Sequence, residues 1–143
     1  MLPCVKATMC YTAAMQRKTG AIMITHGSRS AEGNAIMGRV AQRLRVRLGT
    51  DLIEPCFMEQ NEPTISMAIE RLLAHGCNHI FAYAVFLVPG KHLHEDIPAM
   101  IAAALADHHG VTHEITGPIL DDPDLFECIA QRLERALHSP RRP

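Results

Sequence analysis

Three stretches of this sequence end in side chains that can bind a metal ion or carry a proton. The segment "GAIMITHG" delivers His26, "DLIEPCFME" delivers Glu59, and "FAYAVFLVPGKH" delivers His92. Imidazole and carboxylate groups together suit divalent first-row metals such as Fe, Co, Ni and Zn. A neutral imidazole can also accept a proton near pH 7. These residue types therefore indicate a site that handles a metal ion and protons together.

Each of the three stretches begins as an apolar run, and a segment with helical periodicity follows it. We predict strands over 20–27, 51–59, 79–88 and 111–117, and helices over 30–48, from Pro63 or Thr64 to Gly76, from His94 or Ile97 to His109, and from Asp122 to Leu137. Strands that alternate with helices form βαβ units with a parallel sheet and right-handed crossovers. The fold class is therefore α/β, a single flavodoxin-like domain whose four-stranded parallel sheet is flanked by helices.

Patterns within these segments predict which parts are buried. Pro55 places the second strand at an edge or a bulge, and the alternating pattern of the fourth strand also indicates an edge. Cys56 and Cys128 have apolar neighbours and are expected to be inert core residues. A buried stripe is predicted on the last helix, formed by Leu125, Ile129, Leu133 and Leu137.

The parallel fold predicts that the three reactive side chains meet. Ligands of an open α/β sheet bind at the carboxyl ends of its strands, where His26, Glu59 and His92 all fall. Taken singly, each of these residues has an ordinary reading as a hydrogen-bonded or solvated loop residue. Their joint placement favours a shared site, and the sequence leaves open whether His94 and Glu95 belong to it.

Charged and small residues beside this site predict an anionic, bulky ligand. Arg29 and Lys91 can meet negative charge, and Ser28 precedes a helix whose N-terminus attracts anions. Gly27 and Gly90 would let a flat ligand approach the backbone closely. A second basic group lies on one face of the 30–48 helix and is expected to solvate it and complement its dipole: Arg39, Arg43 and Arg47.

Composition narrows the remaining possibilities. The 143 residues carry a net charge of −1 and only 4% aromatic residues, which does not favour a nucleic-acid partner. Five scattered cysteines without C-x-x-C spacing fit a reducing cytoplasm. We find neither a membrane-spanning run nor a signal peptide. The expected organisation is a loose tail over 1–19, one domain over 20–138 and a short tail over 139–143.

Three longer motifs carry a family resemblance. The segments "THGSRSAEGNA", "CFMEQNEPTISMAIERLLAHGCNHI" and "VFLVPGKHLHEDIP" occur in this order within residues 20–137. Together they resemble the small single-lobe sirohydrochlorin chelatases, class II enzymes that insert cobalt, iron or nickel during tetrapyrrole synthesis. The last segment is similar to that family's "FLFxGxHxxxDIP" motif and is the most specific of the three. The chain departs from the family at Thr25, where glycine is frequent.

The resemblance implies a chelatase, a lyase of cobalamin or siroheme biosynthesis, in a chelatase-like lobe. It implies His26 and His92 as the principal metal-handling and proton-accepting pair, with Glu59 in the same cleft. The divalent metal is then a substrate, with cobalt the first choice and iron or nickel the alternatives, and no organic cofactor is expected. Because longer relatives carry two such lobes in one chain, a homodimer is implied, with no nucleic-acid or membrane partner.

Other functions remain open from the sequence. A metal or tetrapyrrole carrier on the same scaffold would use the same histidines without turnover. A flavodoxin-like signalling domain is disfavoured, because Thr25 and His26 stand where an acidic phosphoacceptor would end the first strand. Precorrin-2 is an alternative substrate to sirohydrochlorin, and the sequence does not select one metal, since affinities at N/O sites follow a general order.

Overall fold

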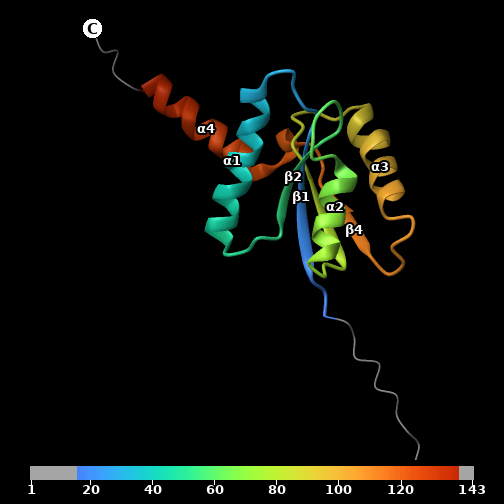
Figure 1. Ribbon diagram of the computed structural model, residues 1–143. Helices are drawn as coiled ribbons and strands as arrows, with labels where there is room; N and C mark the ends of the chain where they lie inside the picture. Colours follow the sequence, from blue (N-terminus) through green and yellow to red (C-terminus); the bar gives the residue numbers. More distant parts are fainter. Residues whose placement is uncertain (1–15, 139–143) are drawn as a thin grey trace, which may run out of the picture.

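The computed structural model describes residues 16–138, in which strands and helices alternate in the predicted order (Figure 1). The strands are β1 (Thr19–Thr25), β2 (Ile53–Phe57), β3 (His79–Ala84) and β4 (Thr112–Ile115). The helices are α1 (Ala31–Leu48), α2 (Ile65–Ala74), α3 (Ile97–Ala104) and α4 (Pro123–His138), with a π-helix η1 (His92–Asp96) and a 3-10 helix η2 (Ile119–Asp121). Most of the predicted tails, together with Cys4 and Cys10, lies outside the described residues.

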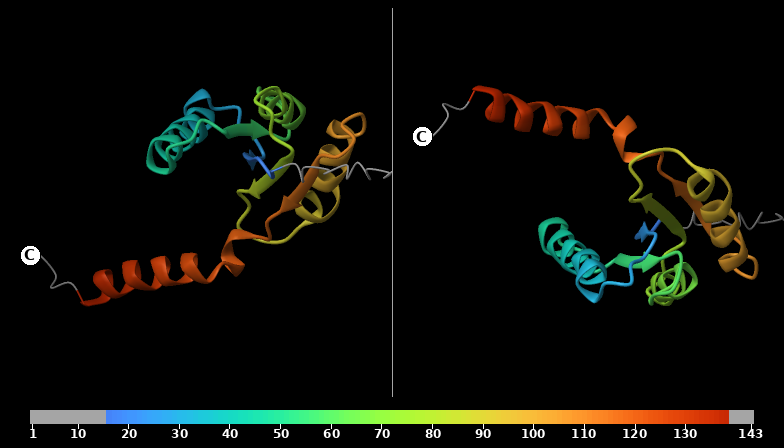
Figure 2. Two further views of the ribbon diagram at one scale, coloured as in Figure 1. Left: turned by 90° about the horizontal axis from the view of Figure 1, so that it is seen from below. Right: turned by 90° about the horizontal axis from the view of Figure 1, so that it is seen from above.

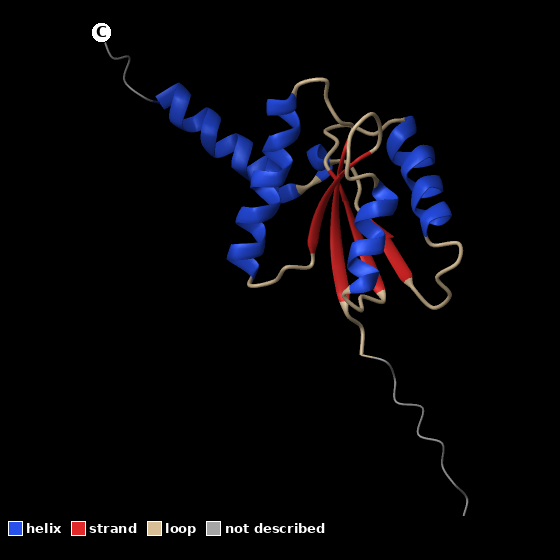
Figure 3. Cartoon of the chain, viewed as in Figure 1, coloured by secondary structure: helices blue, strands red, loops and turns tan. Residues whose placement is uncertain are grey.

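All four strands are parallel and lie in the spatial order β2-β1-β3-β4 (Figure 3). Ile24 near the end of β1 is opposite both Cys56 of β2 and Ala84 of β3, so these three strands end at one edge. The edge strands are β2, which contains Pro55, and β4, which confirms both sequence predictions. This register brings the segments that follow β1, β2 and β3 together.

Helices α2 and α3 cover one face of the sheet and form the larger core (Figure 2). Thr64 caps α2 by accepting a hydrogen bond from Met67 N over 3.3 Å. Each aliphatic side chain buried here contributes about 1.5–3 kcal/mol to folding. The large side chains that are fully buried on this face are Ile22, Ile24, Ile65, Ile69, Leu72, Ile80, Ile97 and Ile101.

Helix α1 packs on the opposite face, over β1 and β2. Ser30 caps its start by accepting from Gly33 N, and Gly49 ends it with a φ of 64°. Arg45 donates to Ile53 O over 2.9 Å and pairs with Glu54, which anchors the helix to the edge strand β2. The core on this side is smaller and consists of Met23, Met37, Ala41, Ile53 and Phe57.

Two elements end four or five residues earlier than the sequence predicts, whereas the predicted ends of the others differ from the structure by about two residues or fewer. Strand β3 stops at Ala84 rather than at residue 88, because the chain leaves the sheet and the carbonyl of Phe86 accepts from Ile119 N over 2.8 Å. Helix α3 stops at Ala104 rather than at His109, and the chain turns through Gly110, whose φ is 90°. These segments serve as connections between neighbouring elements instead of extending the strand and the helix.

The prediction of a buried stripe on α4 is wrong for the single chain. This helix projects from the body of the fold, as Figures 1 and 2 show, and its main contacts are with η2. Leu133 is 57% exposed and Leu137 is 78% exposed. Cys128 is also exposed rather than a core residue, whereas Cys56 is fully buried as predicted. Within residues 16–138 no helix is long and apolar enough to span a membrane.

Candidate active site at the carboxyl edge of the sheet

His26 and Glu59 follow neighbouring strands and are held by backbone hydrogen bonds that continue the sheet. Met58 N donates to Thr25 O over 2.9 Å, and Glu59 N donates to His26 O over 3.2 Å. The His26 Nε2 and Glu59 Oε2 atoms are 3.8 Å apart, and both side chains are half exposed. This separation is too long for a hydrogen bond, but an ion bound to both atoms at about 2.0–2.2 Å from each could bridge it.

His92 reaches the same place from the segment after β3. It is the first residue of η1, and its ring lies edge-to-face with that of His26, with centroids 5.2 Å apart and an interplanar angle of 67°. The Phe86 ring is also near, tilted by 43° with its centroid 6.4 Å from that of His92. The structure therefore brings His26, Glu59 and His92 together from three different strands.

Asp96 is a further member of the site that the sequence analysis did not select. His92 Nδ1 and Asp96 Oδ2 are 2.8 Å apart, and the residues are four positions apart within η1. Because a carboxylate can only accept, Nδ1 of a neutral His92 carries the proton and Nε2 keeps its lone pair. The i,i+4 spacing in "HLHED" was the available signal, but Glu95 was an equally plausible carboxylate there.

Gly27 allows the loops after β1 and β2 to pack closely. Its φ is 99°, and a Cβ at this position would come within 2.7 Å of both Asn61 Oδ1 and the Glu59 carbonyl. The Asn61 side chain in turn accepts from Ser28 N over 3.2 Å. By contrast, a Cβ at Gly90 would meet nothing within 4 Å, so packing within this chain does not require glycine there.

Two cavities adjoin the reactive side chains and share one residue. The first has a volume of about 240 Å³ and is lined by the loops after β1 and β2, including His26 and Arg29. The second has a volume of about 420 Å³ and lies toward α3, where Asp96 and Met100 line it. Glu59 lines both of them.

The predicted substrate-binding residues differ in whether their side chains are exposed or already hydrogen-bonded within the chain. Arg29 and Lys91 are exposed, and Arg29 lines the first cavity. The Ser28 hydroxyl is already engaged, because it accepts from Ser30 N over 3.0 Å and so supports the start of α1. His94 and Glu95 are exposed, and within residues 16–138 their side chains make no hydrogen bond or ion pair with the residues of the site.

The donor set at this edge consists of nitrogen and oxygen atoms. Burial, with a contribution from Glu54, raises the pKa of the Cys56 thiol to about 12, and burial also raises the pKa of Cys77. These two thiols are therefore protonated and remain in the core. Within residues 16–138 no group of three or more His, Cys, Asp or Glu side chains is arranged to hold a metal ion.

Comparisons with known proteins agree with this fold. The chloroplastic sirohydrochlorin ferrochelatase of Arabidopsis thaliana is 30% identical over 118 residues, which are 82% of this chain and 52% of that protein. The sirohydrochlorin cobaltochelatase of Sulfurisphaera tokodaii is 31% identical over 123 residues, which are 86% of this chain and 98% of that protein. This chain thus spans about half the length of the plant relative and nearly all of the archaeal one.

A solved structure gives the same result. The cobalamin (vitamin B12) biosynthesis CbiX protein from Marinobacter aquaeolei VT8 is 27% identical with a TM-score of 0.70, and the match covers 86% of this chain and 100% of that one. The profile of the CbiX family matches residues 20–136. The chain belongs to the CbiX family.

Proposed function

We propose that this chain is a sirohydrochlorin chelatase, which inserts a divalent metal ion into a free tetrapyrrole. The observation that carries the proposal is the meeting of His26, Glu59 and His92 at one half-exposed edge of the sheet. The names of the family relatives, sirohydrochlorin cobaltochelatase and ferrochelatase, support the substrate and the reaction class.

The reaction needs groups that release a metal and accept protons. Insertion forms bonds from the metal to the four pyrrole nitrogens, releases two N–H protons and removes water from the metal, with no electron transfer. His26 and Glu59, 3.8 Å apart, hold the incoming metal as a substrate. The open donor set lets the metal leave for the macrocycle. Cobalt is the first candidate, with iron and nickel next.

The proton acceptors are His92 and, once the metal has left its Nε2 atom, His26. Each imidazole lies beside a carboxylate, Glu59 for His26 and Asp96 for His92. A carboxylate next to an imidazole stabilises the imidazolium that forms when the ring takes a proton. Asp96 also fixes the His92 ring so that Nε2 is the basic atom. We assign His92 the larger effect on turnover, because its hydrogen bond is direct.

The anionic substrate is held by positive groups at the rim. Sirohydrochlorin carries many carboxylates, and two exposed cations are near the histidines in sequence: Arg29 follows His26 by three residues, and Lys91 directly precedes His92. Arginine can bind a carboxylate through two parallel hydrogen bonds. The backbone start of α1, supported by Ser28, adds a positive dipole end.

Assembly and compartment complete the proposal. The chain spans about half of the plant relative, which supports a homodimer of two lobes. Cys56, Cys77 and Cys128 are free thiols, which supports the reducing cytoplasm as the compartment.

The experiment is an absorbance assay of the purified full chain with sirohydrochlorin and Co²⁺. We expect the spectrum to shift faster than in the enzyme-free control and to continue through many turnovers. His92→Ala should lower the rate by about 10²–10⁴-fold, the usual contribution of a general base. Repeating the assay with Fe²⁺ and Ni²⁺ ranks the metals. A change that stops at one equivalent would favour a carrier, and an unchanged rate in His92→Ala would remove His92 from the mechanism.

Asp96 provides a finer test of the same site. Asp96→Asn keeps an oxygen that can accept from Nδ1, whereas Asp96→Ala removes the partner. We expect the turnover rate to fall in the order wild type, Asn, Ala, with little change in the Michaelis constant for sirohydrochlorin. The exposed neighbour Glu95→Ala is the matched control and should retain the wild-type rate. Equal rates in Asp96→Ala and Glu95→Ala would show that the contact does not orient His92.

A further inference from the structure

The two cavities beside the active site differ in charge. The cavity lined by the loops after β1 and β2 contains the cation Arg29 as well as the shared carboxylate of Glu59. The cavity toward α3, which we call the α3 cavity, has five lining residues: Met58, Glu59, Asp96, Ala99 and Met100. Two of these five are carboxylates and none is a cation. The α3 cavity therefore attracts a divalent cation and repels an anionic ligand.

The carboxylates of the α3 cavity keep their charge available for an ion. The Glu59 side chain is 47% exposed, and its nearest charged neighbour is His26 at 3.8 Å. Asp96 uses Oδ2 for its contact with His92, and within residues 16–138 its Oδ1 atom makes no hydrogen bond or ion pair. Among the same residues, neither carboxylate pairs with a lysine or an arginine. A cation that enters the cavity thus meets two oxygen donors whose charge no basic side chain cancels.

The walls of the α3 cavity are held in place by buried residues on both sides. Ile97 and Ile101 are fully excluded from solvent and fix the first turns of α3 in the core. On the strand side, Met58 is 9% exposed, and its N–H donates to Thr25 O over 2.9 Å. Ala99 is exposed and therefore lies at the rim of the cavity. The cavity is formed by the packing of the chain itself and needs no ligand to open it.

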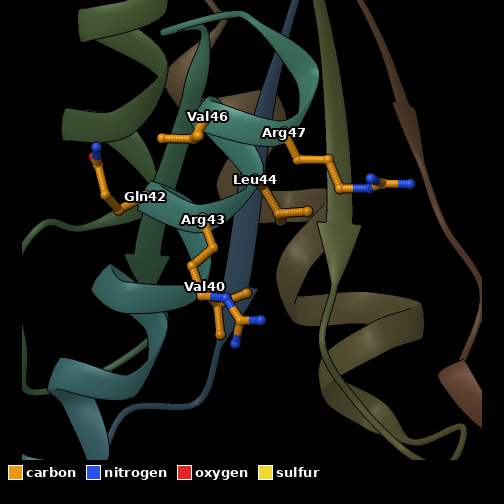
Figure 4. Close-up of a pocket in the computed structure, with 6 residues that line it drawn as sticks. All are labelled: Val40, Gln42, Arg43, Leu44, Val46 and Arg47. Carbon is orange, nitrogen blue, oxygen red and sulfur yellow. The ribbon is translucent and has the colours of Figure 1, made fainter.

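A larger cavity along α1 does not suit a metal ion. Its volume is about 600 Å³, and Figure 4 shows Arg43 and Arg47 among the side chains that line it. Arg45, between these two in sequence, donates to the carbonyl of Ile53, the first residue of β2. This cavity therefore lies toward the amino end of β2, away from the active-site edge. Its guanidinium groups would repel a cation.

We propose that the α3 cavity is the entrance through which the metal ion reaches Glu59, whereas the tetrapyrrole approaches from the side of Arg29. This inference rests on the proposed chelatase function and adds the route of one substrate. Glu59 lines both cavities, so it can receive the ion from one side and present it on the other. Because the two substrates arrive from different sides, the metal can enter while the macrocycle is already bound.

The first test changes the charge at the rim of the α3 cavity. Ala99→Lys and Ala99→Glu add opposite charges, and Ala99→Gln controls for side-chain size. With sirohydrochlorin saturating, we expect the Michaelis constant for Co²⁺ to rise about two- to fivefold in Ala99→Lys and to fall by a similar factor in Ala99→Glu, as for a unit charge within about a Debye length of a divalent ion. The Michaelis constant for sirohydrochlorin should not rise in Ala99→Lys, because an added cation does not repel an anionic macrocycle.

Ala106 provides the matched control position. It is exposed, follows Ala99 by seven residues and does not line the α3 cavity. Seven residues are about two helical turns, or about 10 Å, so salt screens most of a charge placed there. Ala106→Lys should therefore leave the Michaelis constant for Co²⁺ within about twofold of the wild-type value. Raising the salt concentration should also reduce the difference between Ala99→Lys and Ala99→Glu.

The second test obstructs the entrance without adding charge. Ala99→Phe places a bulky side chain at the rim, and Ala106→Phe is its control. The full chain is first loaded with sirohydrochlorin, and Co²⁺ is then added by rapid mixing. At low Co²⁺ concentration, we expect insertion to be several-fold slower in Ala99→Phe than in wild type and unchanged in Ala106→Phe. Circular dichroism checks that all variants are folded.

The outcomes separate this inference from the proposed function. Equal Michaelis constants for Co²⁺ in Ala99→Lys and Ala99→Glu would overturn the entrance. A wild type in which bound sirohydrochlorin keeps Co²⁺ out would also overturn it, because both substrates would then use one route. If the wild type shows no turnover, the chelatase proposal fails, and calorimetry of Co²⁺ binding to the chain alone still tests the cavity. Dissociation constants that are equal in Ala99→Lys and Ala99→Glu would then contradict the inference.

Discussion

The two faces of the sheet differ in how completely one chain covers them. Under α2 and α3, Ile69, Ile80 and Ile101 are fully excluded from solvent. Among the described residues, α1 is the only helix that packs on the other face, and α4, the last helix, projects away from the body of the fold (Figure 2). The closed face can hold the strands in register without help. The open face offers apolar surface that a second copy can use.

The closed face of the sheet therefore determines the stability of the fold, whereas the open face affects how copies of the chain associate. The active-site residues leave the sheet at its carboxyl edge, where the loop after β1 packs on the loop after β2 through Gly27 and Asn61. The site therefore depends on strand register, which the closed face maintains. Changes on the open face should alter association before they alter the site.

The reactivity of thiols gives the largest expected contrast between the regions. With Cys4 and Cys10 replaced by serine, Cys56 in the closed core and Cys128 on α4 can be compared in the folded protein. A Cys56 pKa of about 12 leaves about 10⁻⁴ of this thiol ionised at pH 8, and burial blocks access. Cys128 should react at least about a thousandfold faster with a soluble disulfide reagent, with the labelled residue identified by peptide mass spectrometry. Similar rates would mean that the closed face opens readily.

Removing side-chain volume from the closed face gives the next largest effect. Ile69→Ala should lower the free energy of unfolding by about 2–5 kcal/mol, because it removes a fully buried side chain and leaves a cavity. Val46→Ala is the control on α1, where the valine is 75% exposed, and should change the value by less than about 0.5 kcal/mol. Urea denaturation measures both. Comparable losses would contradict the distinction between the two regions.

Acid should destabilise the fold through His79, which lies at the amino end of β3. Burial lowers the pKa of His79, the Arg17 guanidinium and His113 lower it further, and Glu114 opposes them. Arg17 donates to Nε2, which must then be unprotonated, and Nδ1 is 2.7 Å from Thr112 Oγ1. Because the unfolded chain binds this proton more readily, stability is lost as the pH falls below about 6.5 toward the lower folded value.

His79→Gln is the variant that measures this effect. Its free energy of unfolding at pH 8 should be lower than that of wild type, because a buried partner is lost, but it should decline less between pH 8 and pH 5.5. His75→Gln, at an exposed position, should decline as wild type does. If the free energy of unfolding fell more steeply with acid in His79→Gln than in wild type, His79 would not be the group whose protonation destabilises the fold.

Thr25 gives the smallest expected effect. Its Oγ1 atom is buried and has no hydrogen-bond partner among the described residues. Thr25→Val has the same shape without the hydroxyl, so the free energy of unfolding should rise by up to about 1 kcal/mol. Thr25→Ser keeps the hydroxyl and loses a methyl group, so it should be less stable than wild type. A loss of stability in Thr25→Val would reveal a partner for the hydroxyl, such as bound water.

The sequence predicted the convergence of the site because parallel strands impose it. His26, Glu59 and His92 could be placed together without coordinates, since each follows an apolar run that forms a strand. The contact between His92 and Asp96 could not be predicted in this way. It depends on how many residues form the helical turn between them, and the hydrophobic periodicity does not distinguish a π-turn from an α-turn.

The α4 stripe shows a different limit of sequence patterns. The spacing of Ile129, Leu133 and Leu137 correctly identified the apolar side of the helix. A periodic pattern shows which side chains favour burial, but not which chain covers them. The early end of α3 at Ala104 has a similar origin, because His108 pairs with Glu70 of α2 over 2.9 Å, a contact between elements that no local pattern contains.

The π-helix η1 makes chain length at this point as important as residue identity. Ile97 N bonds to the carbonyl of His92, five residues back, so this turn holds one residue more than an α-turn. Deleting one residue between His92 and Asp96 would convert the π-turn to an ordinary α-turn and change their spacing from four residues to three. The hydrogen bond between the two side chains would then need a different geometry, although neither residue had changed. A single-codon deletion could thus alter the orientation of the His92 ring without any substitution.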